Sequence, residues 1–537
     1  MTVARTVADV LAEHTLFEVE CIDRMYLNVY QPRLQYAAGL VGFVHRRLGL
    51  PIASTAPLGK VSDRFTRAVH RFAVTEGIEW VDFAKGQRKD DVMQERLKSF
   101  IAPEGVVFIG RAQEKNTVFR TEKRRHPDGT TYPWIVKSTG VINQYYFYCV
   151  DEDFGPFFLK FCSYFPYTGK LCINGNHWAQ RQAAKAGIGF TAMDNAFAAV
   201  DDPHALQQIC DRLGPVQIRA LLDKWLAILP NPFTEKDIDA GYRYDLSILQ
   251  AEFSLTQMLD NPVSGRVFFE EVIRENLDIG RPDQVGLIFD RKLRRRGRGV
   301  TPGRFRTRVI TEGVTPSLHV NYKNASIKQY HKQGRALRTE TTINDTRDFG
   351  IGKRLTNLPA LREIGFPANR RLLRVQTLGH DPITGIDVLH TVTDPVITES
   401  GTRVPGLRLG QQRSHALLSV LLILRLQPNG FTNKDLRPLI AELRGLPPGQ
   451  VTTGQLTYDL RRLRLHGLIT RIPHSRRYQV TGTGLRTARY LSAIHDRLLP
   501  TGLAILADAD QPRPLRTAAN AYQAAFDKLT ATVGLAA

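Results

Sequence analysis

Residues 317–345, SLHVNYKNASIKQYHKQGRALRTETTIND, alternate apolar and polar side chains in three short segments. Segments of this length with a period of two are typical of β-strands that bury one face. Asn324 and Gly334 separate the segments, and both residue types accept the backbone angles of tight turns. A further alternating segment, RVITEG at 308–313, precedes them and ends at Gly313. The stretch therefore predicts a run of antiparallel strands with turns at Gly313, Asn324 and Gly334.

The chain around this stretch divides into three expected domains. Residues 1–290 hold strand candidates rich in aromatic and β-branched side chains, which alternate with amphipathic helical patterns. Residues 291–400 hold the strands described above, and residues 401–537 are mainly helical. We therefore expect a multidomain α+β or mixed α/β fold. It would comprise a large α/β domain that could hold a catalytic core, a basic β-rich domain and a C-terminal helical domain.

The C-terminal region has the most legible pattern. Three helical segments, the second opening at Thr432 as its expected N-cap, precede two short strands around a basic tip at 470–484. Residues 414–484 resemble the winged-helix family of DNA-binding domains, and LRRLRLHGLITRIP at 460–473 carries this likeness best. The resemblance implies that the third helix enters the major groove while the wing lies along the DNA backbone. It assigns nucleic-acid contacts to Gln455, Arg461, Arg462, Arg464, Arg471, Arg476 and Arg477. Docking of a protein by the same module is the alternative.

The charge of the chain points to a polyanionic partner. The net charge is +21 with a sequence pI near 9.9, and residues 401–537 alone hold 19 basic and seven acidic side chains. The stretch LRRRGRGVTPGRFRTRV at 293–309 contains no acidic residue, and a run of one sign gains only when something negative lies against it. We therefore expect nucleic acid as the partner, DNA first and RNA as an alternative. The expected phosphate contacts here are Arg294, Arg295, Arg296, Arg298, Arg304, Arg306 and Arg308.

The same hairpin segments suggest a catalytic site. A strand with Lys328, Tyr330 and Lys332 on one face, beside a strand with Arg338 and Glu340, would bring a phenol, a carboxylate and cations together. A tyrosine can attack a phosphodiester when cations and a metal held by a carboxylate offset the developing charge. The pattern KxYxK…LRxE also resembles a segment of the rolling-circle replication initiators of plasmids and filamentous phages. This resemblance implies a nicking-and-joining domain with Tyr330 as nucleophile and Glu340 at a metal.

Two features of the sequence limit this interpretation. The His-hydrophobe-His metal motif of most rolling-circle nucleases is absent from the chain. Tyrosine and lysine on a sheet are also ordinary ligands of phosphate, so a hairpin that only grips a backbone is the alternative. In that case Lys328, Lys332 and Arg338 would hold phosphates without any catalysis.

Acidic residues of the first region suggest a rival site. Asp23 lies in a strand candidate, Glu114 follows the strand candidate VVFIGRAQ, and Glu252 lies in a segment with a helical pattern. Together such carboxylates could bind Mg²⁺ or Mn²⁺ for phosphodiester hydrolysis or strand transfer. Asp23, Glu114 and Glu340 are thus the candidate metal ligands. Pairing of these acids with neighbouring arginines such as Arg24 or Arg111 is the simpler alternative, and it requires no cofactor.

Several other classes of protein are disfavoured. The five cysteines form no CxxC pair, which indicates reduced thiols and a cytoplasmic location, and no apolar run is long enough to span a bilayer. The phosphate-loop, HExxH and GxSxG motifs are missing. Taken nearly end to end, the chain also resembles a widespread group of bacterial and archaeal proteins, through segments such as LRTETTINDTRDFG at 337–350 and KLCINGNHWAQRQ at 170–182. That resemblance implies a prokaryotic module linked to mobile elements, and no particular reaction.

Two hypotheses follow from these observations. The first is a DNA-processing protein, which would nick DNA, initiate replication or act as a transposase, with Mg²⁺ or Mn²⁺ as cofactor. The second is a non-catalytic winged-helix regulator, or a protein that binds a structured RNA. The sequence leaves the oligomeric state open.

Overall fold

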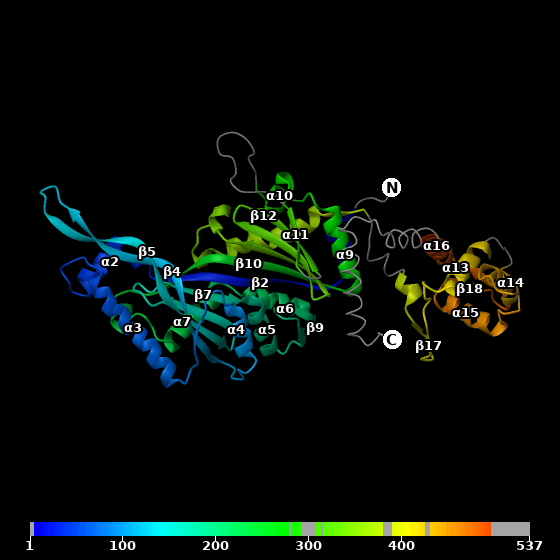
Figure 1. Ribbon diagram of the computed structural model, residues 1–537, viewed down its shortest axis with the longest axis horizontal. Helices are drawn as coiled ribbons and strands as arrows, with labels where there is room; N and C mark the ends of the chain where they lie inside the picture. The colour runs from blue at the N-terminus through cyan, green and yellow to red at the C-terminus, as the bar shows by residue number, and fades with distance from the viewer. Residues whose placement is uncertain are drawn as a thin grey trace. The chain divides into compact units, whose positions relative to one another are not determined.

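A computed structural model of the chain describes residues 5–260, 262–279, 281–291, 307–312, 315–379, 389–424, 430–447 and 449–495. The chain forms two compact units, residues 1–383 and 384–537. The first unit contains a large sheet with helices on its faces, and the second is built from short helices and a small hairpin (Figure 1). The expected multidomain α+β fold class is therefore confirmed.

Within the described residues, eleven strands of the first unit form one sheet in the order β11-β12-β13-β14-β10-β2-β7-β6-β5-β4-β3. All neighbouring strands are antiparallel except β3 and β4. The strands are β2 (Thr15–Tyr30), β3 (Trp80–Asp82), β4 (Gly105–Arg125), β5 (Thr131–Asp151), β6 (Gly155–Cys162), β7 (Gly169–Asn174), β10 (Asp245–Leu259), β11 (Thr307–Glu312), β12 (Thr315–Tyr322), β13 (Ala325–Lys332) and β14 (Ala336–Ile343).

Helices and shorter strands surround this sheet. Two small pairs of strands are β1 (Arg5–Thr6) with β15 (Thr377–Leu378), and β8 (Phe190–Ala192) with β9 (Phe197–Val200). The helices are α1 (Val7–His14), η1 (Pro32–Leu34), α2 (Ala37–Gly42), η2 (Phe43–Arg47), α3 (Ala56–Thr75), α4 (Lys89–Leu97), α5 (Gly175–Lys185), α6 (Pro203–Arg212), α7 (Pro215–Ile228), α8 (Glu235–Asp239), α9 (Pro262–Glu275), α10 (Pro282–Phe289), η3 (Thr346–Phe349), η4 (Leu355–Asn357) and α11 (Leu358–Val375).

The strands expected at 308–343 are present as β11 to β14, but they do not form a domain of their own. Strand β14 pairs with β10 along its whole length, for example Glu340 opposite Ser254. The hairpins therefore extend the sheet of the N-terminal region, because backbone donors and acceptors on the edge of β10 would otherwise lack partners. The expected boundary at 290 runs through one sheet, and the compact units separate after residue 383 instead.

The segment with a helical pattern around Glu252 is strand β10, so the helix expected there is wrong. The strand lies between β14 and β2 near the middle of the sheet. Figure 1 shows α10 and α11 on one side of β2 and β10, and α5 and α6 on the other. β10 is buried at most of its positions, yet Ala251, Phe253 and Leu255 alternate with polar residues, which is the pattern of a strand that the helical interpretation overlooked.

A bulge in β2 places two charged residues opposite a single residue of β10. Ile22 lies opposite Phe253 and Met25 opposite Ala251, so Asp23 and Arg24 together face Glu252 on the neighbouring strand. The extra residue leaves a local kink in the strand and re-aims the side chains beside it.

The second unit follows the expected order of helices and strands. It contains β16 (Val396–Ile397), β17 (Arg403–Val404), α13 (Gln412–Leu424), α14 (Asn433–Leu443), α15 (Thr453–Leu465), β18 (Ile469–Arg471), β19 (Tyr478–Val480) and α16 (Gly482–Ala493). Thr432 caps α14 as expected, and Thr452 caps α15 through a capping box with Gln455. Leucines at helical spacing on α13 and α15, such as Leu421 and Leu460, fill its core.

No helix in the described part of the chain is both long and apolar enough to cross a membrane.

Candidate functional site

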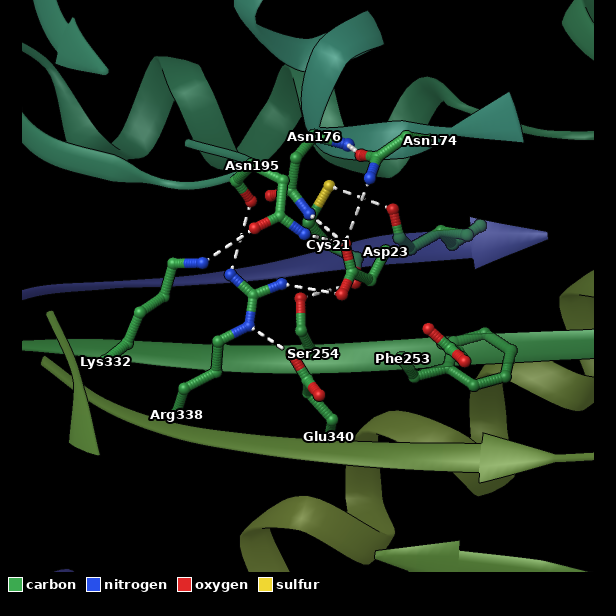
Figure 2. Close-up of polar contacts among 12 residues, drawn as sticks. Cys21, Asp23, Asn174, Asn176, Asn195, Phe253, Ser254, Lys332, Arg338 and Glu340 are labelled. Carbon is green, nitrogen blue, oxygen red and sulfur yellow. Dashed lines mark hydrogen bonds and ion pairs between the residues drawn. The ribbon is translucent and has the colours of Figure 1, made fainter. Parts of the chain in front are cut away.

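Asp23 and Arg338 form the centre of a buried polar cluster between the sheet and the elements that cover it. The Arg338 side chain is fully buried, with Nη2 2.8 Å from Asp23 Oδ2 and Nε donating to Glu340 Oε1 at 2.6 Å. Figure 2 shows Arg338 extending from β14 toward Asp23 on β2. One guanidinium thus joins two carboxylates that lie two strands apart in the sheet.

Three asparagines complete the environment of Asp23. The side-chain amides of Asn195, Asn176 and Asn174 donate to Asp23 Oδ1 at 2.7, 3.0 and 3.4 Å (Figure 2). Burial alone would raise the pKa of Asp23, but the positive charge of Arg338 and the amide donors lower it below its ordinary value. Asp23 is therefore a fixed, ionised acceptor in the folded protein.

The asparagines come from segments that cover the sheet. Asn174 ends β7 and caps α5, Asn176 lies in the first turn of α5, and Asn195 lies in the turn between β8 and β9. Lys332 Nζ also donates to Asn195 Oδ1, at 2.7 Å. None of the three amides was predicted, since no spacing in the sequence relates them to Asp23.

Tyr330 lies next to this cluster on β13. Its hydroxyl donates to Glu340 Oε1 at 2.9 Å, and Lys328 Nζ lies 4.4 Å from the centre of its ring. Burial and the negative charge of Glu340 raise the pKa of Tyr330 above its ordinary value. The hydroxyl is thus held in its protonated form beside a carboxylate that could accept its proton.

Members of the two catalytic sites that the sequence suggested separately lie in one region of the structure: Asp23 and Glu252 of one, and Glu340 of the other. Glu252 faces Asp23 across the β2 bulge, and Glu340 lies on the strand next to it. Burial, followed by the negative charge of Asp23, raises the pKa of Glu252 to about 7. The surroundings of Glu252 therefore favour its protonated, uncharged form.

Glu114 does not belong to this region. It lies on β4, four strand positions from β2 and hence about 19 Å away by the usual strand spacing. Its carboxylate accepts hydrogen bonds from Lys160 Nζ at 2.5 Å, from Lys89 Nζ at 2.7 Å and from the Tyr146 hydroxyl. Although burial opposes the shift, these donors lower the pKa of Glu114 to about 2. The expected convergence of Asp23, Glu114 and Glu252 is wrong.

The predicted metal ligands do not fit a divalent cation. Asp23 and Glu340 both direct an oxygen to the Arg338 guanidinium, which already supplies the positive charge between them. Glu114 is bound to two lysines. In the part of the chain that the structure describes, no three side chains of His, Cys, Asp or Glu are grouped to hold a metal.

The predicted phosphate ligands of the first unit separate into three groups. Arg338 and Lys332 are buried and bonded within the cluster, so they are not available to a backbone. Lys328 is half-buried on the polar face of β13, and Arg308 is exposed on β11, at the edge of the sheet. The other arginines of the basic stretch lie outside the described residues, and they are Arg294, Arg295, Arg296, Arg298, Arg304 and Arg306.

Helix α15 of the second unit presents a polar face with free cations. Arg461 and Arg464 are exposed, and neither guanidinium has a hydrogen bond or an ion pair with any described residue. Gln455 is exposed too, and its side-chain oxygen accepts from Thr452 N at 3.2 Å. Arg462 is different, because it is buried and donates to the carbonyls of Pro405 at 3.1 Å and Gly406 at 2.5 Å. The prediction that Arg462 contacts nucleic acid is therefore wrong.

The hairpin between β18 and β19 adds further arginines. Arg476 is exposed at its tip and has no hydrogen bond or ion pair within the described residues. Arg471 is exposed and donates to the Ser475 carbonyl at 2.9 Å, whereas Arg477 is half-buried. The exposed arginines of α15 and of this hairpin are thus Arg461, Arg464, Arg471 and Arg476.

No family model, curated protein or solved structure matches this chain.

Proposed function

We propose that the protein binds duplex DNA through the second unit, with α15 in the major groove and the β18–β19 hairpin along the backbone. The observation that carries this proposal is the set of exposed arginines without internal partners on one helix and the adjacent hairpin. Unpaired cations at a surface gain favourable electrostatic energy when an anion binds to them. The phosphate backbone of a nucleic acid supplies a row of such anions.

The arrangement of the unit supports duplex DNA over RNA. Helix α15 is the third of three short helices and directly precedes a two-stranded hairpin, which is the order found in winged-helix proteins. Its exposed face carries both polar groups that can contact base edges, such as Gln455 and Thr457, and arginines. A helix of this size fits the major groove of B-form DNA, whereas the major groove of A-form RNA is too narrow to admit it.

The test measures the affinity of the full chain for duplex DNA as a function of salt. We expect the triple variant Arg461→Ser, Arg464→Ser, Arg476→Ser to bind more weakly, with the salt slope reduced by about 2.7 if each arginine contacts one phosphate. Arg71→Ser, an exposed arginine on α3, is the matched control and keeps the slope. An unchanged slope in the triple variant would contradict the proposal, and equal affinity for duplex RNA would contradict the groove assignment.

A second candidate function is strand cleavage by Tyr330, favoured by its 2.9 Å hydrogen bond to Glu340. In this reaction the tyrosine oxygen forms a bond to phosphorus while Glu340 takes the phenolic proton. The phosphorus–oxygen bond to the leaving strand breaks, and the released hydroxyl takes up a proton. The pairing of Glu340 with Arg338 weakens the carboxylate as a base, so we rank this function second.

Cleavage is tested with supercoiled plasmid and the full chain. We expect nicking that leaves protein attached to a strand end, that disappears in Tyr330→Phe and that persists in Tyr36→Phe, an exposed tyrosine. An intact plasmid in the presence of tight binding would leave the protein as a DNA-binding protein only.

A further inference from the structure

A row of polar side chains crosses the sheet far from the Asp23 cluster. Asn28 on β2 lies opposite Lys170 on β7, Lys170 lies opposite Lys160 on β6, and Lys160 lies opposite Tyr146 on β5. Residues that are directly opposite share one face of a sheet, so these side chains are neighbours. Asn28, Lys170 and Lys160 of this row form part of the wall of a cavity of about 400 Å³. That volume lies within the range of small-molecule sites, which begins at about 300 Å³.

The positive charge in this cavity exceeds what the protein neutralises. Four lysines line it, and Glu114 is the one acidic residue among the lining side chains. Glu114 is already shared by Lys160 and by Lys89 of α4. Lys115, Lys137 and Lys170 have no hydrogen bond or ion pair with any residue that the structure describes. The cavity therefore carries a surplus of cations.

Lys160 and Lys170 lie opposite each other, and the repulsion between their charges lowers the stability of the sheet unless an anion is bound. Like charges directly opposite on neighbouring strands destabilise a sheet. Lys160 is buried, and its burial, with the charges of Lys170 and Lys89, lowers its pKa despite the bond to Glu114. An anion bound over the pair would relieve the repulsion.

A second, independent feature points to a ligand. Gln144 lines the same cavity and is only 2% exposed, yet its side-chain nitrogen has no hydrogen-bond partner. A buried amide donor without an acceptor is rare, because it loses the hydrogen bond that it makes to water in the unfolded chain. Asn28, Asn116 and Thr168 place further donors and acceptors on the wall. The cavity thus combines cations for a phosphate with neutral groups that can bind the polar body of an organic molecule.

We infer that this cavity binds the phosphate group of a nucleotide, either a free nucleotide or the phosphorylated end of a single strand. Lys160 and Lys170 hold the phosphate, Lys115 and Lys137 attract it from the rim, and the Gln144 amide donates to it or to the attached sugar. The site lies in the first unit and does not depend on DNA binding by the second.

Calorimetric titration of the full chain tests the site. The probes are AMP, adenosine, and a trithymidylate with and without a 5′-phosphate. We expect each phosphorylated probe to bind at least about tenfold more tightly than its unphosphorylated counterpart, since charged hydrogen bonds are lost with the phosphate. Tighter binding of AMP identifies a free nucleotide as the ligand, and tighter binding of the trithymidylate identifies a strand end. Equal binding of phosphorylated and unphosphorylated probes overturns the proposal.

Variants locate the binding. Lys170→Gln and Gln144→Glu should each weaken the phosphorylated probes by about tenfold or more, the second because it replaces a donor with a negative charge. Lys137→Gln, at an exposed position, tests the site if either of these variants fails to fold. Lys60→Gln, an exposed lysine on α3, is the control and keeps the affinity. The double variant Arg461→Ser, Arg464→Ser keeps it as well, which separates this site from DNA binding. Wild-type affinity in Lys170→Gln and Lys137→Gln overturns the assignment.

Discussion

Arg338 in the first unit and Arg461 in the second are the same residue type in opposite circumstances. Arg338 is fully buried between two carboxylates and also donates to the Asn195 carbonyl at 3.2 Å. Arg461 is exposed and has no partner among the described residues. Both were equally good candidates for binding phosphate when only the sequence was considered.

The partners of an arginine decide its role. A guanidinium whose donors are satisfied inside the protein has none left for a ligand, and removing it leaves charges buried. A guanidinium on the surface contributes little to folding and keeps all its donors for a ligand. Arg338 therefore serves the structure of the first unit, whereas Arg461 keeps its donors available at the surface of the second.

Loss of the buried arginine should have the largest effect. We expect Arg338→Met to lower the free energy of unfolding by about 3–5 kcal/mol, because Asp23 and Glu340 would be buried without a counter-charge. All four tryptophans, Trp80, Trp134, Trp178 and Trp225, lie in the first unit, so tryptophan fluorescence in urea reports its unfolding. Arg335→Met, at an exposed position three residues away, is the control. A loss of less than about 1 kcal/mol would show that the cluster is not a unit of stability.

Glu252, a half-buried carboxyl group that lacks enough compensating charge, should behave in the opposite way. Glu252 has a pKa of about 7 in the folded protein and 4.5 ordinarily, so the folded state favours its protonated form. Its contribution to stability is present below pH 4.5 and is lost as the pH rises to 7. Glu252→Gln should therefore stabilise the first unit by up to about 3 kcal/mol above pH 7 and leave it unchanged near pH 4. Glu95→Gln, at an exposed position, should show no such dependence, and an equal gain at both pH values would contradict the assignment.

Two adjacent arginines of α15 provide the sharpest form of the comparison. Arg462→Ser should destabilise the second unit by about 1.5–3 kcal/mol, because the carbonyls of Pro405 and Gly406 lose a charged donor. Arg461→Ser should leave stability unchanged and weaken DNA binding instead. Hydrogen exchange of the α15 amides measures the first effect, and anisotropy of labelled duplex DNA measures the second. The distinction fails if both variants affect stability to the same extent.

The smallest effect concerns the lysine pair of the cavity. Without ligand, Lys170→Gln should stabilise the first unit by about 0.2–1 kcal/mol, because it removes a like charge directly opposite Lys160. The same variant should lose the stabilisation that AMP gives the wild type. Tryptophan fluorescence in urea, with and without AMP, measures both quantities. A variant that is less stable than the wild type without ligand would mean that Lys170 has a structural role.

Part of the fold could be predicted because local patterns determine it. The alternation at 317–345 predicted three strands and their turns, and these are β12, β13 and β14. The helix cap at Thr432 and the core leucines of α15 were likewise predicted, since both depend on residues only a few positions apart in the sequence. Strand β10 was not, although Ala251, Phe253 and Leu255 alternate with polar residues, because the longer segment was interpreted as a helix.

The candidate site was predicted only within one hairpin. Tyr330 and Glu340 were placed together because the register of two adjacent strands follows from the turn between them. Asp23 joins them through Arg338, across a sequence separation of more than 300 residues, and no local pattern relates the two. Asn195 and Gln144 gave no signal for the same reason.

By itself, the sequence determined the chemistry that is present: a basic chain, strands at 317–343, three short helices before a basic hairpin, and a surplus of arginine. Which of these charges remain available depends on the tertiary structure. Pairing depends on contacts between distant segments, and burial makes an unpaired charge far more costly than an exposed one. For that reason Arg338 and Arg462 became part of the protein interior, whereas Arg461 and Arg464 stayed at the surface.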